Sequence, residues 1–244
     1  MLEVRGLTKT FGALRACDGI DFEVREGETH AVIGPNGAGK TTFISQLAGN
    51  LLPDAGSVRF AGTDITRLPA PRRARLGLAR SFQITSIYPE FSALDNVALA
   101  IQAHSGHSFR FWKRARGDPA LAGPAERVLE EVGIKERKSV LAANLSHGEQ
   151  RQLEVAMALA TDPRLLLLDE PMAGMGTDES QRMIALLSRL KQTKTIILVE
   201  HDMDAVFRLA DRISVLVYGR VIATGAPEAI RANVEVRKAY LGEA

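Results

Sequence analysis

The sequence has little of what marks extracellular, membrane-spanning or nucleic-acid-binding proteins. Its 244 residues include one cysteine, Cys17, which cannot form a disulfide within the chain and therefore favours a reducing compartment. No stretch approaches the ~20 consecutive apolar residues of a membrane-spanning helix. The first residues contain no apolar run of the kind found in secretory signals, so we expect no such signal. With 31 basic and 29 acidic side chains the chain lacks the basic excess of nucleic-acid binders, so we expect no nucleic-acid partner.

The composition that is present fits one compact globular domain with room for an inserted subdomain, because 45% of the residues are hydrophobic and 25% charged. Residues 1–30 alternate short β-like runs with turn residues, which predicts an antiparallel sheet, and residues 56–62 are expected to join it. Residues 84–160 have a helical pattern. The apolar residues expected to share one helical face there are Phe91, Leu94, Val97, Ala98 and Ile101.

Two almost entirely apolar runs, at residues 165–168 and 195–199, indicate strands that are buried on both faces. Between them lies an amphipathic helix that contains Ile184, Leu187 and Leu190. A further buried strand is expected at residues 29–33, directly before a glycine-rich loop and a helix at residues 41–48. Strands that alternate with helices in this way predict an α/β core built on a parallel sheet.

The glycine-rich loop fits the pattern G-x-x-x-x-G-K-[ST] and lies between a predicted strand and a predicted helix, the context this motif requires. Its backbone N–H groups and the start of the helix would cradle a polyphosphate. Lys40 is expected to reach the β and γ phosphates, and Thr41 to bind Mg²⁺. The residues expected to contact the nucleotide are Gly34, Pro35, Asn36, Gly37, Ala38, Gly39, Lys40, Thr41 and Thr42.

Polar residues follow both apolar runs at the edge where open α/β sheets bind ligands. Asp169 suits a Mg²⁺ partner, acting through water, and Glu170 suits a general base that polarises the attacking water. His201 is placed to donate to a γ-phosphate oxygen. Without the phosphate loop upstream, the acidic pair could equally be solvated residues at the end of a strand. The histidine would then fit a structural role.

Residues 145–150 predict a helix start, because Ser146 and Glu149 have the spacing of a capping box. This could be a good N-cap and nothing more. The segment lies some twenty residues before the acidic strand, however, and there it resembles the signature motif of ABC transporter ATPases, usually Leu-Ser-Gly-Gly-Gln. His147 stands where that family usually has glycine, and residues 173–176 lack the aspartate that commonly ends the family's D-loop, the segment after the acidic pair.

The resemblance to ABC transporter ATPases covers essentially the whole chain. It implies a P-loop NTPase (RecA-like) core at residues 1–83 and 161–222, which includes an N-terminal antiparallel β subdomain. Residues 84–160 would form an inserted α-helical subdomain that carries the signature motif, and residues 223–244 a C-terminal helical tail. By the same resemblance, Gln83 matches a catalytic glutamine that also contacts the metal, and Phe11 an aromatic that stacks on adenine; a core aromatic is the alternative for Phe11.

In this family ATP lies between the phosphate loop of one subunit and the signature helix of another, which implies a dimer with ATP and Mg²⁺ as cofactors. The second subunit would contribute Ser146, His147, Gly148 and Glu149. A second helix N-terminus near the γ-phosphate would add N–H donors where negative charge must be held. Hydrolysis would remove the phosphate that joins the two halves and let them part.

Residues 77–83, 200–203 and 237–242 look like those of ATPase subunits from branched-chain amino acid importers and their urea-type relatives. Such systems combine two ATPase subunits, two membrane permeases and a periplasmic solute-binding protein, so a peripheral position on the cytoplasmic face of the inner membrane is implied. The basic, aromatic run at residues 104–117 is expected to be a surface loop near the membrane or permease.

Three alternatives stay open beside import. An ATPase of a lipopolysaccharide-type exporter would share a similar tail. An ABC ATPase that acts on nucleic acid or ribosomes would need long coiled coils or two ATPase units in one chain, and the sequence has neither. Against a nucleotide-binding module without turnover stands the intact Glu170.

Overall fold

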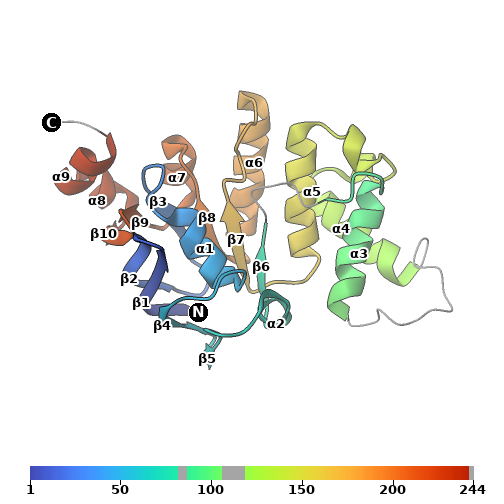
Figure 1. Cartoon of the computed structure of the whole chain (residues 1–244). Coiled ribbons are helices and arrows are strands. Elements are labelled where there is room, and N and C mark those ends of the chain that lie inside the picture. The colour runs from blue at the N-terminus through green and yellow to red at the C-terminus, as the bar shows by residue number, and fades with distance from the viewer. Residues whose placement is uncertain (82–86, 106–118, 242–244) are drawn as a thin grey trace.

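The computed structural model describes residues 1–81, 87–105 and 119–241, which form two sheets flanked by helices (Figure 1). The first sheet is the antiparallel one predicted at the N-terminus, with strand order β2-β1-β4-β5. Its strands are β1 (Leu2–Phe11), β2 (Leu14–Val24), β4 (Ala55–Phe60) and β5 (Thr63–Asp64). The expectation that residues 56–62 join this sheet is confirmed, because β4 pairs antiparallel with β1.

The second sheet is the α/β core, with strand order β10-β9-β3-β8-β7-β6. Its strands are β3 (Thr29–Ile33), β6 (Leu78–Arg80), β7 (Leu165–Asp169), β8 (Thr195–Val199), β9 (Arg212–Val217) and β10 (Arg220–Gly225). All neighbours pair in parallel except β10, which runs antiparallel to β9. Every residue of β3, β7 and β8 is buried, as expected for parallel strands covered on both faces.

Helices cover both faces of the core sheet. The helix after the glycine-rich loop, α1 (Lys40–Ala48), packs between the core sheet and the antiparallel sheet in one apolar cluster. On the other face lie α6 (Thr177–Leu190) and α7 (Met203–Leu209). Ile184, Leu187 and Leu190 of α6 are each 2% exposed, so the predicted amphipathic helix and its apolar face are confirmed. The short α2 (Ala70–Arg75) precedes β6.

The helical subdomain contains α3 (Ala93–Ser105), α4 (Pro119–Glu131) and α5 (His147–Leu159), with 3₁₀ turns at Lys135–Arg137 and Ala142–Asn144. Val97 is fully buried, and three of its predicted face-mates pack against the core. The placement of Phe91 on that face was wrong. The hydroxyl of Ser92 accepts a bond from the N–H of Asp95, so α3 begins after Phe91, which remains 42% exposed beside Tyr88. The run at residues 104–117 falls almost entirely outside the described residues.

The C-terminal tail begins later than predicted. Strand β10 continues to Gly225, so residues 223–225 belong to the core sheet and the helical part starts at Pro227. The tail consists of α8 (Pro227–Ala232), α9 (Val234–Val236) and a π-helical turn at Arg237–Leu241. The guanidinium of Arg231 lies 4.1 Å from the ring centre of Phe207, and this contact joins α8 to α7. Across all described residues, the helices are too short or too polar to cross a bilayer.

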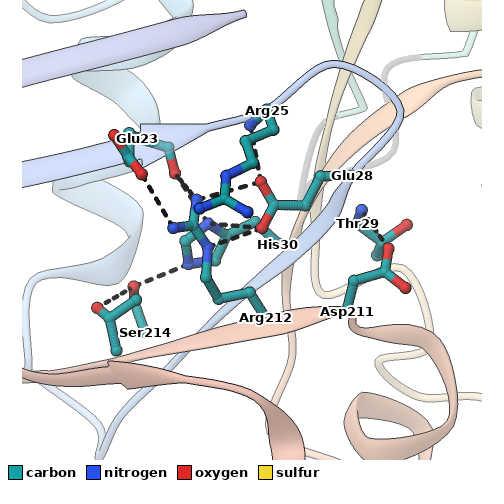
Figure 2. Close-up of polar contacts among 9 residues, drawn as sticks. Glu23, Arg25, Glu28, Thr29, His30, Asp211, Arg212 and Ser214 are labelled. Carbon is teal, nitrogen blue, oxygen red and sulfur yellow. Dashed lines mark hydrogen bonds and ion pairs between the residues drawn. The ribbon is translucent and has the colours of Figure 1, made fainter.

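Figure 2 shows the polar contacts that join the two sheets at the amino ends of the core strands. Arg212 of β9 is paired with Glu23 of β2 at 3.1 Å and with Glu28 at 2.7 Å. The ring of His30, which is 1% exposed, donates from Nδ1 to the carbonyl of Glu23 at 3.0 Å. Its Nε2 must therefore accept the hydroxyl proton of Ser214, at 2.8 Å.

Candidate nucleotide-binding site

The residues predicted to bind nucleotide gather at one edge because β8 lies between β3 and β7. Val199 of β8 is level with Val32 of β3 on one side and with Asp169 of β7 on the other. Parallel strands end at the same edge, so the glycine-rich loop, the acidic pair and His201 all emerge there. The next strand, β6, ends at Arg80, and the segment that contains Gln83 follows it; Gln83 lies outside the described residues.

Two glycines let the phosphate loop pack tightly against neighbouring backbone. A Cβ atom on Gly34 would clash with the carbonyl oxygen of Leu216, and one on Gly39 with that of Ala16. Gly39 also has a φ of 103°, which side chains rarely tolerate. The loop thus enters α1 along a path that only glycine permits at these two positions, and this supports the motif read from the sequence.

Lys40 lies inside the loop. It is 8% exposed, and its ammonium donates to the carbonyls of Gly34 at 2.6 Å and Pro35 at 3.1 Å. Burial lowers the pKa of Lys40, while the nearby carboxylates of Glu170 and Asp169 act to raise it. A phosphate entering the loop would offer this ammonium a full negative charge in exchange for two neutral carbonyls.

Asp169 offers one oxygen for a metal ion. Its side chain is fully buried, and Oδ2 accepts from the guanidinium of Arg80 at 2.9 Å. Oδ1 is buried and has no hydrogen-bond partner among the described residues. Burial raises the pKa of Asp169, Arg80 acts to lower it, and Glu170 acts to raise it. A buried carboxylate oxygen left without a donor, together with the hydroxyl of Thr41, fits the oxygen ligands that Mg²⁺ prefers.

Glu170 directly follows the end of β7 and turns the chain sharply. Its φ of 50° is in the left-handed region, which costs a non-glycine residue about 1–2 kcal/mol. The N–H of Glu170 donates to the carbonyl of Val199 at 2.9 Å, and its carbonyl accepts from the N–H of Ala173 at 3.1 Å. These bonds hold the strained residue at the edge of the sheet, with its side chain only half buried.

His201 emerges beside Glu170 with a side chain that is 60% exposed. Its backbone is held by Glu200, which is 1% exposed. Oε2 of Glu200 accepts from the N–H of His201 at 3.0 Å and of Asp202 at 3.4 Å. Burial raises the pKa of Glu200, and the backbone donors around it act to lower the pKa. The imidazole is thus presented to solvent from a firmly bonded backbone.

Phe11 ends β1 at the tip of the hairpin with β2 and is 49% exposed, with the Lys9 ammonium 5.7 Å from the centre of its ring. The exposure argues against an ordinary core aromatic. The turn between β9 and β10 connects this hairpin to the phosphate loop, because the N–H of Gly219 donates to Ala38 and its carbonyl accepts from Asp18. The ring therefore belongs to an element that packs beside the loop.

The signature segment has the predicted capping box. The N–H of Glu149 donates to the hydroxyl of Ser146 at 3.2 Å, and the N–H of Ser146 donates to the carboxylate of Glu149 at 2.9 Å. The carboxylate of Glu179, from α6, also accepts from the hydroxyl of Ser146 and from the N–H of Gly148, each at 3.2 Å. His147 donates from Nε2 to the carbonyl of Ala173 at 3.0 Å. Two donors at this helix start, the hydroxyl of Ser146 and the N–H of Gly148, are therefore bonded to a carboxylate of the same chain.

Sequence reasoning missed three residues of this site: Arg80, Glu179 and Glu200. Arg80 and Glu200 could have been found from the sequence, because each is a charged residue inside or next to a buried strand. Charged groups are rarely buried unless they are paired, so such a position indicates a bonded partner. Glu179 had no signal of its own, since it lies in the first turn of an amphipathic helix where acidic residues are ordinary.

The fold and the edge residues together define an α/β nucleotide-binding protein of the P-loop class. Residues 17–173 match the family described as "ABC transporter", and residues 220–244 match "Branched-chain amino acid ATP-binding cassette transporter". The high-affinity branched-chain amino acid transport ATP-binding protein BraF of Pseudomonas aeruginosa is 40% identical, over all of this chain and 98% of the relative. LivG of Escherichia coli K12, which has the same description, is 37% identical over the same shares.

Solved structures agree with these relatives. A nucleotide-free ATP-binding cassette from an ABC transporter has a TM-score of 0.87 and 28% identity, covering 100% of this chain and 99% of the other. An ABC transporter cassette in its ADP conformation gives the same values. The chain therefore belongs to the ABC transporter family. It is an ATP-binding, ATP-hydrolysing subunit of that family, so the expected fold class and enzyme class are confirmed.

Proposed function

We propose that this subunit powers the import of branched-chain amino acids or related small polar solutes across a membrane. The observation that carries the proposal is the match of residues 220–244 to the branched-chain amino acid cassette family, a part of the chain outside the shared ABC match. Relatives that carry the branched-chain name align along the whole chain, which supports the same conclusion. Fold alone would not distinguish import from export.

ATP is proposed to bind at the edge of the core sheet. The backbone N–H groups of residues 36–39 and the start of α1 face the phosphates, and Thr42 lies in the first turn of that helix. Lys40 releases the carbonyls of Gly34 and Pro35 and binds phosphate oxygens instead. The half-exposed ring of Phe11 stacks on the adenine base.

Thr41, Asp169 and Gln83 are proposed as the residues that would hold Mg²⁺. Thr41 would supply its hydroxyl, Asp169 its buried Oδ1 through a water molecule, and Gln83 a further oxygen. When bound, the ion neutralises the charge that develops on the transferred phosphoryl group. Arg80 acts to lower the pKa of Asp169 and fixes the direction of the carboxylate by its bond to Oδ2.

Hydrolysis is proposed to use Glu170, His201 and Gln83. Glu170 accepts a proton from, or polarises, the water that attacks the γ-phosphate, and its half-buried side chain at the sheet edge supports this role. His201 donates a hydrogen bond to a γ-phosphate oxygen and so stabilises negative charge there. The backbone N–H groups of both residues are held by hydrogen bonds, which fixes the point of the sheet edge from which each side chain starts.

A second subunit, identical or related, is proposed to complete the site with Ser146, His147, Gly148 and Glu149. Its α5 presents an N-terminus and two donors, the hydroxyl of Ser146 and the N–H of Gly148, to the γ-phosphate. His147 is bonded to its own chain at Ala173, so this departure from the usual glycine need not obstruct the incoming phosphate. Loss of the γ-phosphate then lets the two subunits separate.

The remaining partners are proposed to be two transmembrane permease subunits and, indirectly, a periplasmic solute-binding protein. The ATPase would then work as a peripheral subunit on the cytoplasmic face of the cell membrane. A solved structure of cbiO1 from Clostridium perfringens is described as part of the ABC transporter complex cbiONQ. It is 26% identical, covers 97% of this chain and has a TM-score of 0.81, which supports assembly into a transporter complex.

Reconstitution tests the import proposal. The chain is captured from its own cells together with the permease and the solute-binding protein that accompany it, and the complex is placed in liposomes with ATP inside. Leucine, isoleucine or valine added outside with the binding protein should enter the liposomes, and the Glu170→Gln subunit should abolish entry. Movement of solute out of the ATP-containing compartment in the same assay would overturn the import claim, as would co-purification with an exporter permease.

A further inference from the structure

Glu200 connects the two backbone segments that carry Glu170 and His201. Its carboxylate is almost completely buried, and each oxygen is bonded to a different segment. Oε1 accepts from the N–H of Met172, two residues beyond Glu170, at 3.0 Å. Oε2 accepts from the N–H of His201 at 3.0 Å and lies 3.7 Å from Nδ1 of the same residue. One carboxylate thereby joins the end of β7 to the end of β8.

Two hydrogen bonds among the described residues attach the turn after Glu170 to the end of the neighbouring strand. Glu170 itself donates to the carbonyl of Val199, which is the last residue of β8. The bond from Met172 to Glu200 is a second attachment of this turn to the same strand end. With both bonds in place, the strained backbone at Glu170 is fixed relative to the backbone at His201.

The same connection continues toward the signature helix. Ala173 follows Met172 directly, and its carbonyl accepts a bond from the ring of His147 at 3.0 Å. A hydrogen-bonded path therefore leads from His201 through Glu200 and residues 172–173 to the start of α5. The ends of β7 and β8 and the start of α5 are thus joined by hydrogen bonds.

We infer that Glu200 is a positioning residue for hydrolysis, which sets the relative placement of Glu170 and His201 without touching the nucleotide. This inference rests on the proposed function of those two residues. Misplacing a catalytic group by about 1 Å is enough to lower a rate about 100-fold. A carboxylate suits the task because it has only acceptors, and its bonds with Met172, His201 and Asp202 all come from backbone N–H donors.

The test is Glu200→Gln in the full-length chain. The amide keeps the size of the side chain, but its NH₂ group faces N–H donors on one of the two segments. The kcat for ATP hydrolysis should fall about 10- to 100-fold, the usual effect of removing a residue that orients a catalytic group. The KM for Mg-ATP and the Kd for ATP should stay within about twofold, because the phosphate contacts remain in place.

A matched control is Glu28→Gln. Glu28 is 8% exposed and its carboxylate also accepts a backbone bond, from Arg25, but it lies at the opposite, amino edge of the core sheet (Figure 2). If Glu200 matters only for stability, both variants should lower activity in proportion to their loss in Tm. The inference requires Glu200→Gln to lose far more kcat than Glu28→Gln at equal Tm, and equal losses would overturn it.

A double variant separates positioning from a general effect. His201→Ala and Glu200→Gln are measured singly and together, and if Glu200 acts through His201 the two losses in kcat should not multiply. Fully multiplicative losses would overturn the inference.

The variant Glu200→Asp keeps the charge but has a shorter side chain. It should restore less than a tenth of the kcat difference between Glu200→Gln and the wild type. Its full activity would show that the bridge is unnecessary.

Failure of this inference and failure of the proposed function give different results. If the wild-type chain hydrolyses ATP, Glu170→Gln does not, and Glu200→Gln equals the wild type, only the positioning role is refuted. If Glu170→Gln hydrolyses ATP as fast as the wild type, the assignment of the base fails first, whatever Glu200→Gln does.

Discussion

The guanidinium of Arg80 lies 2.9 Å from the carboxylate of Asp169, and both side chains are almost completely buried. The two residues come from neighbouring parallel strands, β6 and β7, whose register places Arg80 beside Leu167. Arg80 also donates to the hydroxyl of Ser45 in α1 at 3.2 Å. One side chain thus joins the strand that leads to Gln83, the acidic strand and the helix that follows the phosphate loop.

Replacing Arg80 with methionine should destabilise the protein strongly. The variant removes the cation that is bonded to the buried carboxylate of Asp169, and breaking a buried pair from one side costs about 3–5 kcal/mol. Urea unfolding followed by circular dichroism measures the loss. The comparison variant is Lys135→Met, which removes an exposed pair with Glu130 and should leave the midpoint nearly unchanged. Equal shifts for the two variants would contradict the structural role of Arg80.

Glu170→Gln should lower steady-state ATP hydrolysis by roughly 10² to 10⁴ and leave ATP binding intact. The amide cannot accept a proton from the attacking water, but it preserves the side chain's size and the backbone bond to Val199. Phosphate release measures turnover, and isothermal titration calorimetry with Mg-ATP measures binding. Unchanged hydrolysis would refute the assignment of Glu170 as the base.

Lys40→Ala should weaken ATP binding. Each charge-assisted hydrogen bond contributes about 1.5–3 kcal/mol, so the Kd should rise about 10- to 150-fold. Lys194→Ala is a suitable control, because Lys194 pairs with Asp162 just before β8, at the amino edge of the sheet. Calorimetric titration of both variants with Mg-ATP measures the difference. Wild-type affinity in Lys40→Ala would count against the phosphate loop as the nucleotide site.

The buried ring of His30 should make the free energy of unfolding depend on pH. Burial, and then the charge of Arg212, lower the pKa of its ring to about 3 in the folded chain, so it stays neutral where an unfolded histidine is protonated. Its contribution to stability is therefore complete above about pH 6.5 and is lost as the pH falls toward 3, at up to about 1.4 kcal/mol per pH unit.

The variant that tests this is His30→Gln, whose amide can still donate to Glu23 and accept from Ser214 (Figure 2). Free energies of unfolding are measured from urea titrations at pH 7, 6 and 5. The variant should lose less stability than the wild type across this range, because it has no ring to protonate at that position. Parallel pH dependences for the two proteins would show that His30 does not carry the effect.

The sequence predicted those parts of the fold that depend on local pattern. Two apolar runs marked β7 and β8 almost to the residue, and the capping box at Ser146 and Glu149 marked the start of α5. Phe91 shows the limit of periodicity, because its spacing fits the face of α3 but the cap at Ser92 starts the helix after it. The predicted start of the C-terminal tail at residue 223 was wrong for a similar reason. Strand β10 extends to Gly225 because it pairs with β9, and local composition does not reveal this pairing.

The sequence proposes site residues where a motif fixes both residue type and place, as at residues 34–41 and in the acidic pair. The residues that hold this site together were not predicted, since Arg80 and Glu200 act through partners that are distant in the chain. Arg80 and Asp169 are 89 positions apart, and only the pairing of β6 with β7 brings them together. The order of strands across the sheet, β3-β8-β7-β6, decides which residues meet, and it follows from no single segment.

The position of Glu179 indicates that its carboxylate opposes the ATP-driven association of two subunits. Burial acts to raise the pKa of its carboxyl, but bonds from Ser146, Gly176 and Gly148 outweigh that effect and lower the pKa, so the group is an anion at neutral pH. In the proposed dimer the hydroxyl of Ser146 and the N–H of Gly148 must instead bind the γ-phosphate of the other subunit's ATP. Glu179 therefore competes with that phosphate for the same donors.

Glu179→Gln should accordingly strengthen ATP-driven dimerisation. Removing one negative charge beside a helix N-terminus that must receive a phosphate should lower the dimer Kd roughly two- to fivefold. Analytical ultracentrifugation with ATP, in the Glu170→Gln background that prevents turnover, measures this Kd. Asp178→Asn is the matched control, since Asp178 precedes Glu179 in the same helical turn and is exposed. A weaker dimer for Glu179→Gln, or an equal gain for Asp178→Asn, would show that Glu179 supports the signature helix and does not compete with the phosphate.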